Sequence, residues 1–258
     1  MVHAEELTSY HKVKHIMTPR EQFAWLAADC PCSEAKTRLQ SQGYTYAPLQ
    51  LNGDVLLIPL RSLPDAETPV GDVDLAALAL PRWLWADDEL RYAPAFLQKQ
   101  PAYLVRERTP VVGLLHYSDL NKLAFRGCVY HQIAALEAAM LAHVSATRPE
   151  PKDWKELLAQ ERIERAGNFF EKHKGADTEL TVAMELYIDE LVGLCRPELA
   201  ERLSCAEQDY HECVTKPIKY LRDKVAHVGK AVVNRPQEVE RLANTLEQVA
   251  AIRIALST

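Results

Sequence analysis

The first half of the chain repeats its own pattern at an offset of 57 residues, and this repetition constrains the fold more than any other feature. Aligned positions are apolar or aromatic in both copies: Leu39 and Phe96, Tyr46 and Tyr103, Val55 and Val112, Leu57-Ile58 and Leu114-Leu115, and Leu63 and Leu120. Each copy has a helical start, an extended segment, a turn, a second apolar strand and another helix. Such duplication predicts a pseudo-symmetric domain of two α/β repeats. The alternative is a coincidence between two amphipathic segments, and the undisturbed offset disfavours it.

The second half of the chain has a different period. From about Phe125 onward, apolar residues recur at every third or fourth position, which is the pattern of amphipathic helices. The expected stripes are Val129, Ile133, Leu136, Met140 and Val144; Leu180, Met184, Ile188, Leu191 and Leu194; Ile218, Leu221, Val225, Val228 and Val232; and Val239, Leu242, Leu246, Val249 and Ile252. We therefore expect an α+β chain, in which an α/β module is followed by an all-α bundle and the boundary lies near residues 121–128.

The composition is that of a soluble globular protein, with 48% hydrophobic and 26% charged residues. No apolar run approaches the roughly 20 residues of a membrane span, and the polar N-terminus does not resemble a secretory signal. We therefore expect a cytoplasmic protein without a membrane partner, in which the six cysteines are reduced thiols. Cys205, His211 and Cys213 form only a weak zinc pattern, so no metal site is expected.

Two short motifs in the first half resemble the two copies of a cystathionine-β-synthase (CBS) domain pair. The motifs are His15-Ile-Met-Thr-Pro19 and Pro110-Val-Val-Gly-Leu-Leu-His-Tyr-Ser-Asp-Leu120. A CBS repeat typically ends with Gly, two apolar residues, Thr or Ser, two variable residues and Asp. Gly113 and Asp119 match this pattern, while His116 replaces the hydroxyl residue. In the first copy the equivalent positions hold Leu56, Pro59 and Ser62, so the nucleotide signature is absent there.

The CBS resemblance implies a binding site for an adenine nucleotide or a related adenosyl ligand. An Asp at the start of a helix can accept hydrogen bonds from both ribose hydroxyls, and nearby amides favour phosphate. Asp119 and Gly113 would form this site, while His116 and Tyr117 would contact the base or the phosphate. With one intact half-site, we expect at most one nucleotide per pair. A degenerate pair that serves only as a dimerisation platform is the alternative.

A basic segment near the C-terminus contains the sequence YLRDKVAHVG, residues 220–229. The formal net charge of -6 argues against a broadly basic nucleic-acid surface, but Lys216, Lys219, Arg222, Lys224, Lys230 and Arg235 are opposed only by Asp223. Such a concentration of cations can attract phosphate, although a solvated helix face is the simpler explanation. A helix is expected here, with Thr215 as its cap and Pro217 in its first turn. On such a helix Arg222 and His227 would lie about 140° apart.

The second half resembles the HEPN domain, a small helical bundle found in ribonucleases, toxins and defence proteins. Its active members carry Arg, four to six residues and then His, with a polar residue after the Arg. Arg222, Asp223 and His227 fit this pattern. The resemblance implies metal-independent RNA cleavage that leaves a 2′,3′-cyclic phosphate and needs no cofactor. His227 would act as acid and base, and Arg222 would stabilise the phosphorane. In the family, two chains pair so that two motifs face one cleft.

These observations predict a homodimeric endoribonuclease whose activity responds to a nucleotide. We expect an N-terminal extension at 1–12, a CBS pair at 13–126 with repeats at about 15–63 and 75–123, and a HEPN domain at 127–258. Lys219, Lys224 and Lys230 are the expected RNA contacts. In the alternatives, the HEPN fold is inactive and the protein is a nucleotide-sensing or antitoxin-like regulator, or a helical domain that binds RNA without cleaving it. Arg222 would then simply pair with Asp223 or another acid.

Overall fold

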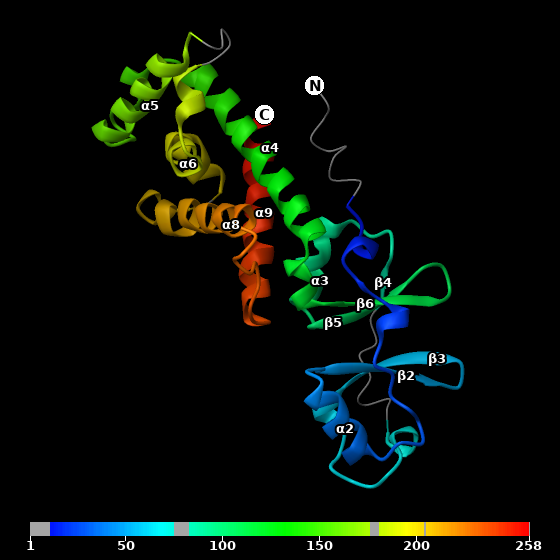
Figure 1. Ribbon diagram of the computed structural model, residues 1–258. Helices are drawn as coiled ribbons and strands as arrows, with labels where there is room; N and C mark the ends of the chain where they lie inside the picture. Colours follow the sequence, from blue (N-terminus) through cyan, green and yellow to red (C-terminus); the bar gives the residue numbers. More distant parts are fainter. Residues whose placement is uncertain (1–10, 75–82, 176–180, 204, 258) are drawn as a thin grey trace. The chain divides into compact units, whose positions relative to one another are not determined.

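The computed structural model describes residues 11–74, 83–175, 181–203 and 205–257 (Figure 1). These residues form two compact units. The first, here called the repeat unit, contains residues 11–125 together with 233–240. The second, the helical unit, contains residues 126–232 and 241–257. Most of the expected N-terminal extension, residues 75–82 at the start of the second repeat, and Leu180 lie outside the described residues.

The two copies of the repeat unit share an α-helix, an antiparallel hairpin and a 3-10 helix in the same order. The first copy contains the 3-10 helices η1 (Val13–His15), η2 (Arg20–Gln22) and η3 (Leu60–Ser62), the strands β1 (Thr18–Pro19), β2 (Tyr46–Leu51) and β3 (Asp54–Pro59), and α2 (Cys32–Ser41). The second contains η4 (Val70–Asp72), β4 (Trp83–Trp85), η5 (Leu90–Tyr92), α3 (Ala93–Leu97), β5 (Ala102–Arg106), β6 (Val111–His116) and η6 (Tyr117–Asn121). Both copies therefore centre on an antiparallel hairpin, β2–β3 in the first and β5–β6 in the second.

The two copies exchange their leading segments. In the four-stranded sheet β1-β6-β5-β4, strand β1 of the first copy pairs with β6 of the second, and Pro19 lies opposite Gly113. Just before β1, the amide of Val13 donates a hydrogen bond to the carbonyl of Asp88 (2.9 Å). The exchange is reciprocal, because the amide of Val70 donates to the carbonyl of Cys30, also at 2.9 Å. Neither copy is therefore self-contained.

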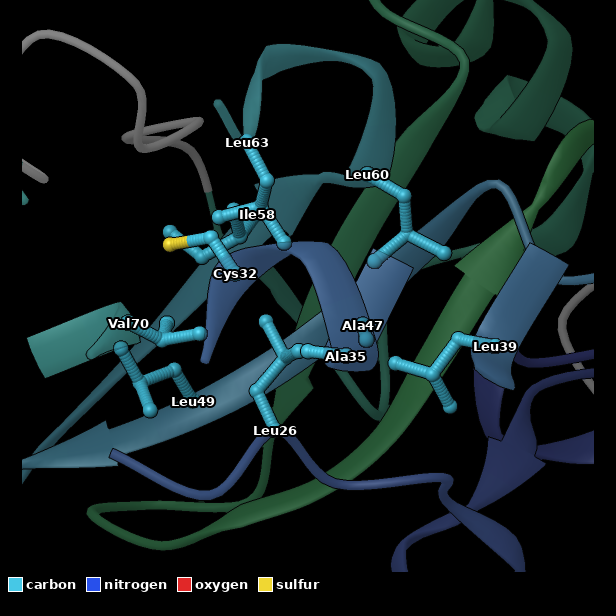
Figure 2. Close-up of a cluster of buried hydrophobic side chains, with 10 residues drawn as sticks. All are labelled: Leu26, Cys32, Ala35, Leu39, Ala47, Leu49, Ile58, Leu60, Leu63 and Val70. Atoms are coloured by element: carbon cyan, nitrogen blue, oxygen red, sulfur yellow. The ribbon is translucent and has the colours of Figure 1, made fainter. Parts of the chain in front are cut away.

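The buried core of the first copy lies between α2 and the β2–β3 hairpin (Figure 2). Cys32, Ala35 and Leu39 recur at spacings of three and four, so they form one face of α2, and all three are buried. Val70, from the leading segment of the second copy, lies among the first copy's side chains in Figure 2. The other face of the hairpin, with Val55 and Leu57, packs against Ala102, Leu104 and Val111 of the second copy. Successive side chains of β3 point to opposite faces of the hairpin. One face therefore packs against α2, and the other packs against the second copy.

The helical unit is built mainly from two long helices and several short ones. Its elements are α4 (Leu123–Thr147), η7 (Pro151–Trp154), α5 (Gln160–His173), η8 (Val182–Glu185), α6 (Ile188–Leu194), α7 (Arg196–Arg202), η9 (Glu207–Asp209), the π-helix η10 (His211–Thr215), α8 (Lys216–Ala226) and α9 (Gln237–Ser257). The stripes predicted for α4 and α9 are buried at every position.

Two of the four predicted helices are shorter than expected. The helix predicted from Leu180 to Leu194 is divided into η8 and α6, and Met184 is 48% exposed. The division lies at Tyr187, whose amide donates to the Glu190 carboxylate (2.7 Å) and so begins a new helix. The helix predicted to reach Val232 ends at Ala226, and Val228 is 72% exposed. The spacing of apolar residues predicted neither the break before α6 nor the end of α8, because apolar residues can keep a helical spacing where the chain changes direction.

The start of α8 and the division of the chain also differ from expectation. Thr215 is the last residue of the π-helix η10. It is buried, has helical backbone angles and makes no capping hydrogen bond. Pro217 lies in the first turn of α8, as predicted. Helix α4 begins at Leu123 rather than near Gly127. Residues 233–240 belong to the repeat unit, although they fall within the stretch predicted to be purely HEPN.

Gly113 should be required by the exchange of β1. A Cβ atom at this position would lie 2.8 Å from Cγ of Met17 and 3.0 Å from the carbonyl oxygen of Thr18. We expect Gly113→Ala to lower the free energy of unfolding by about 1 to 3 kcal/mol, measured by thermal or chemical denaturation. The control is Gly167→Ala in α5, where a Cβ would meet nothing within 4 Å, so stability should be unchanged or slightly higher. An unchanged midpoint for Gly113→Ala would show that β1 is not held closely on β6.

Candidate functional site

The turn from β6 into η6 fixes the orientation of Asp119. The amide of His116 donates to Oδ2 of Asp119 (2.7 Å), and Oδ1 of Asp119 forms an ion pair with Nζ of Lys122 at 2.8 Å. Lys122 also donates to the carbonyl of Ile16 (2.6 Å). The Asp119 side chain is therefore 6% exposed and has a defined rotamer, yet each carboxylate oxygen retains a second lone pair.

This carboxylate lies on the wall of a cavity of about 360 Å³ within the repeat unit, which we call the Asp119 cavity. It brings together the predicted residues His116, Tyr117 and Asp119. The remaining lining residues are Thr18, Gln22, Phe23, Ala24, Gly43, Tyr44, Thr45, Tyr46, Pro48, Leu114 and Ser118. Gly113 is not part of the lining, because it packs beneath Met17. The first-copy residues were not predicted. Thr18, Gln22, Phe23 and Ala24 come from the segment that pairs with β6, and the others come from the start of β2 and the residues just before it.

His116 is a neutral ring in this wall. Burial lowers the pKa of His116, and the nearby Asp119 carboxylate only partly opposes this effect. Its Nδ1 lies 2.8 Å from the hydroxyl oxygen of Ser118 and 3.4 Å from the Ser118 amide nitrogen. Nε2 is buried and has no partner among the described residues. The ring centroid lies 4.2 Å from that of Tyr117, so an aromatic pair borders the cavity.

In the helical unit, Arg222 borders a separate cavity of about 340 Å³, which we call the Arg222 cavity. Arg222 and Asp223 lie three and four positions after Lys219, so all three residues share a side of α8. They meet Glu137, Leu186, Tyr187, Ile188 and Asp189. Nζ of Lys219 lies 2.9 Å from Oδ2 of Asp189, and the Arg222 guanidinium lies 3.4 Å from the Asp223 carboxylate. Burial raises the pKa of Glu137, while the Arg222 charge acts in the opposite direction.

His227 does not lie in the Arg222 cavity. It follows the last residue of α8 in an extended conformation, with φ -108° and ψ 102°, and its side chain is exposed. Among the described residues, no contact joins the side chains of Arg222 and His227. The helical geometry used to relate these residues was therefore wrong, because His227 is not part of the helix.

The three lysines predicted to bind RNA lie in different surroundings. Lys219 borders the Arg222 cavity, as described above. Lys224 lies on another side of α8, where its Nζ donates to the carbonyl of Ala231 (2.7 Å) and lies 5.1 Å from the ring centroid of Tyr220. Lys230 is exposed in the turn that follows His227. Lys224 and Lys230 are thus associated with the turn rather than with Arg222.

Arg126 holds the end of α8 and the turn that carries His227. The side chain is buried, and its guanidinium donates to the carbonyls of Lys224 (2.8 Å), His227 (3.2 Å) and Lys230. The last carbonyls of a helix have no partner within the helix. Arg126 supplies a donor to one of these, that of Lys224, and also to the carbonyls of His227 and Lys230 in the following turn. The amide of Lys230 also donates to the carbonyl of His227 (2.9 Å). No pattern in the sequence pointed to Arg126, because its partners lie about a hundred residues away.

Two further properties of the described residues bear on the site. They contain no group of three or more His, Cys, Asp or Glu side chains arranged to hold a metal ion. None of the helices in the described ranges has the length and apolar character that crossing a membrane would require.

Comparison with known proteins finds similarity only among solved structures. No family model and no curated protein matches the sequence. The CBS domain of a bacterial CNNM/CorC family Mg2+ transporter in complex with ATP is similar, with 14% sequence identity and a TM-score of 0.38, over 50% of this chain and 94% of that one. CBSX2 in complex with AMP is similar with 17% identity and a TM-score of 0.35, over 43% and 93% of the two chains.

Structures of CBS domains thus resemble about half of this chain. The identities and TM-scores are too low to assign the chain to a family. These similarities do not bear on the HEPN resemblance, which stays a prediction.

Arg126 should be essential for the order of the turn at residues 227–230. In Arg126→Met the three carbonyls lose a buried donor, and we expect the helical unit to lose about 2 to 3 kcal/mol of unfolding free energy. Amide hydrogen exchange should accelerate at residues 224–230, as mass spectrometry can measure. Arg253→Met, which removes an Arg near the end of α9 whose side chain forms no hydrogen bond or ion pair with any described residue, is the control and should leave this turn unchanged. Equal exchange in the two variants would contradict the role of Arg126.

Proposed function

We propose that the repeat unit is a sensor that binds an adenine nucleotide or adenosyl ligand in the Asp119 cavity. The observation that carries this proposal is the buried Asp119 carboxylate, held in a fixed orientation on the wall of a cavity that aromatic rings also line. The free lone pairs of the two carboxylate oxygens would accept hydrogen bonds from the ribose hydroxyls. Phe23, Tyr44 and Tyr46 would supply apolar and aromatic surface for the base.

The polar groups beside Asp119 would orient the rest of the ligand. The neutral His116 ring and the Tyr117 hydroxyl can each donate a hydrogen bond to an acceptor on the base or phosphate. The cavity volume of about 360 Å³ is within the range of small-molecule sites, roughly 300 to 1,000 Å³. Two of the similar CBS structures hold ATP and AMP, so adenine nucleotides are the first ligands to test.

Binding should depend on the charge of Asp119. We expect Asp119→Asn to keep an acceptor for the His116 amide but to weaken the hydrogen bonds to ribose, and to raise the Kd for the best-bound nucleotide about tenfold. AMP, ATP, NAD and S-adenosylmethionine would be compared by calorimetry. Ser62→Ala is the matched control, because Ser62 occupies the equivalent position of the first copy and does not line the Asp119 cavity. If none of the four compounds binds the wild-type protein, the repeat unit is a structural platform.

We also propose that the helical unit is a metal-independent endoribonuclease that works as a homodimer. The favouring observation is the availability of the two groups. The Arg222 side chain is 44% exposed and, among the described residues, pairs only with the neighbouring Asp223, and His227 is exposed on a turn that Arg126 holds. As the HEPN resemblance implies, the motifs of two chains would face one cleft, where Arg222 of one protomer would act with His227 of the other. The sensor would then act by favouring one dimer geometry.

The chemistry of the composite site would follow from these two side chains. His227 would take the proton of the 2′-hydroxyl, and the resulting oxygen would attack the adjacent phosphorus. The guanidinium of Arg222 would bind the phosphate oxygens by forked hydrogen bonds as negative charge develops. The 5′-oxygen would leave with a proton, and the product would carry a 2′,3′-cyclic phosphate. Asp223 would limit the motion of Arg222, and the lysines at 219, 224 and 230 would attract the RNA backbone.

The dimer hypothesis makes a quantitative prediction for mixed chains. Arg222→Ala and His227→Ala should each abolish RNA cleavage in EDTA without changing the thermal midpoint. When the two variants are mixed at equal amounts and allowed to exchange, half of the dimers are mixed and each has one intact site. Activity should therefore return to about a quarter of the wild-type value. Full activity of His227→Ala alone, cleavage by a strictly monomeric protein, or loss of activity in EDTA would each reject this mechanism.

A further inference from the structure

Two cysteines meet at the surface of the helical unit. Cys213 is exposed and Cys205 is half-buried, whereas Cys128 and Cys195, the other cysteines of this unit, are buried. The side chains of Cys205 and Cys213 are joined by a hydrogen bond. A disulfide forms only between sulfurs that can approach to about 2 Å, so two thiols already in contact need little rearrangement to be oxidised.

The two thiols of this pair differ in how readily they ionise. Burial raises the pKa of the Cys205 thiol, and the charge and the hydrogen bond of Cys213 raise it further. The Cys205 thiol also donates to the carbonyl of Ala206 (3.5 Å), an interaction that only the protonated thiol can make. Thiols that interact in this way lose their protons in two steps. The exposed Cys213 is therefore the first to become a thiolate, which is the form that attacks an oxidant.

The backbone is held on both sides of the pair. The amide of Cys205 donates to the carbonyl of Ala200 in α7 (2.9 Å). Cys213 lies in the π-helix η10, and its carbonyl accepts a hydrogen bond from Nε2 of Gln248 in α9 (2.9 Å). The π-helix continues directly into α8, which carries Arg222. A bond between the two sulfurs would thus tie the segment that follows α7 to the residues that lead into α8.

We propose that Cys205 and Cys213 are a modification site, at which a low-molecular-weight disulfide such as oxidised glutathione converts the two thiols to a reversible disulfide. The Cys213 thiolate would attack one sulfur of oxidised glutathione, which forms a mixed disulfide and releases one glutathione thiolate. The Cys205 thiol would then lose its proton and attack the sulfur of Cys213, and the second glutathione would leave. The two protein thiols are oxidised, and one oxidised glutathione is reduced to two thiols.

The disulfide would restrict the chain between its two ends. A cross-link removes conformational freedom from the segment that it closes. This segment contains η9 and the first part of η10. A π-helix is rare and often marks a functional position, so its opening and closing are a property that a modification can control. Disulfides of cytosolic proteins are usually transient and redox-sensing, in agreement with a reversible bond of this kind.

The product of oxidation is the first test. We expect oxidised glutathione to give wild-type protein in which peptide mapping links Cys205 to Cys213, and dithiothreitol to reverse the link. Cys205→Ser should stop at the mixed disulfide on Cys213. Cys30→Ser, which changes a half-buried cysteine of the repeat unit, is the matched control and should form the link at the wild-type rate. Phenylarsine oxide, which bridges neighbouring thiols, should bind wild type and Cys30→Ser at least tenfold more tightly than Cys205→Ser or Cys213→Ser.

The effect on the chain has its own measurement. Amide hydrogen exchange at residues 207–215 should be at least tenfold slower in the oxidised wild-type protein than in the reduced protein. Cys205→Ser treated with oxidised glutathione should show no such change. The proposal is overturned if mapping finds no bond between Cys205 and Cys213, if either serine variant binds phenylarsine oxide as tightly as the wild type, or if oxidation leaves exchange at residues 207–215 unchanged. These measurements involve neither nucleotide nor RNA.

Discussion

The exchange of leading segments between the two repeats is the interaction on which the repeat unit depends. It places β1 beside β6, and Val70 inside the core of the first copy. Without it, neither hairpin would have a complete set of neighbours, because each copy supplies part of the other's backbone pairing. The Asp119 cavity is a product of the same exchange. Asp119 comes from the second copy, whereas Thr18, Gln22 and Phe23 come from the segment that the first copy contributes.

The repeat pattern predicted the elements of this unit well, because each copy obeys local rules. Apolar residues at the 57-residue offset fall on equivalent strands, and the Gly113–Asp119 spacing identified the turn at which a buried carboxylate borders a cavity. The pairing between copies was not predictable in this way. Nothing in the local sequence of Thr18-Pro19 specifies Leu114 and Gly113 as partners, since strand pairing over such a separation is decided by the whole fold. The aromatic side of the cavity was missed for that reason.

In the helical unit, periodicity identified the buried faces of α4 and α9 but not where α8 ends. Val228 fits the apolar spacing and is nevertheless exposed, because the chain turns after Ala226 and the carbonyls of the turn accept hydrogen bonds from Arg126. A buried cation that binds backbone carbonyls leaves no signature in sequence spacing, since its partners are not side chains. Because Arg126 binds the carbonyls at the end of α8, His227 lies in the turn after this helix and not on the helix itself. Two residues expected on one helix lie in different backbone environments, because Arg222 is on α8 and His227 is in the extended segment that follows it.

The position of segment 233–240 has a consequence for the order in which the protein is made. During synthesis the N-terminal residues emerge first, and domains generally begin to fold as they leave the ribosome. The first repeat cannot complete its core before Val70 has emerged, and β1 has no partner until β6 is available. Even then a second cavity of the repeat unit, beside Arg61, lacks one wall until Pro236 and Gln237 have been translated, long after β6. This cavity therefore forms only after both repeats and segment 233–240 have left the ribosome.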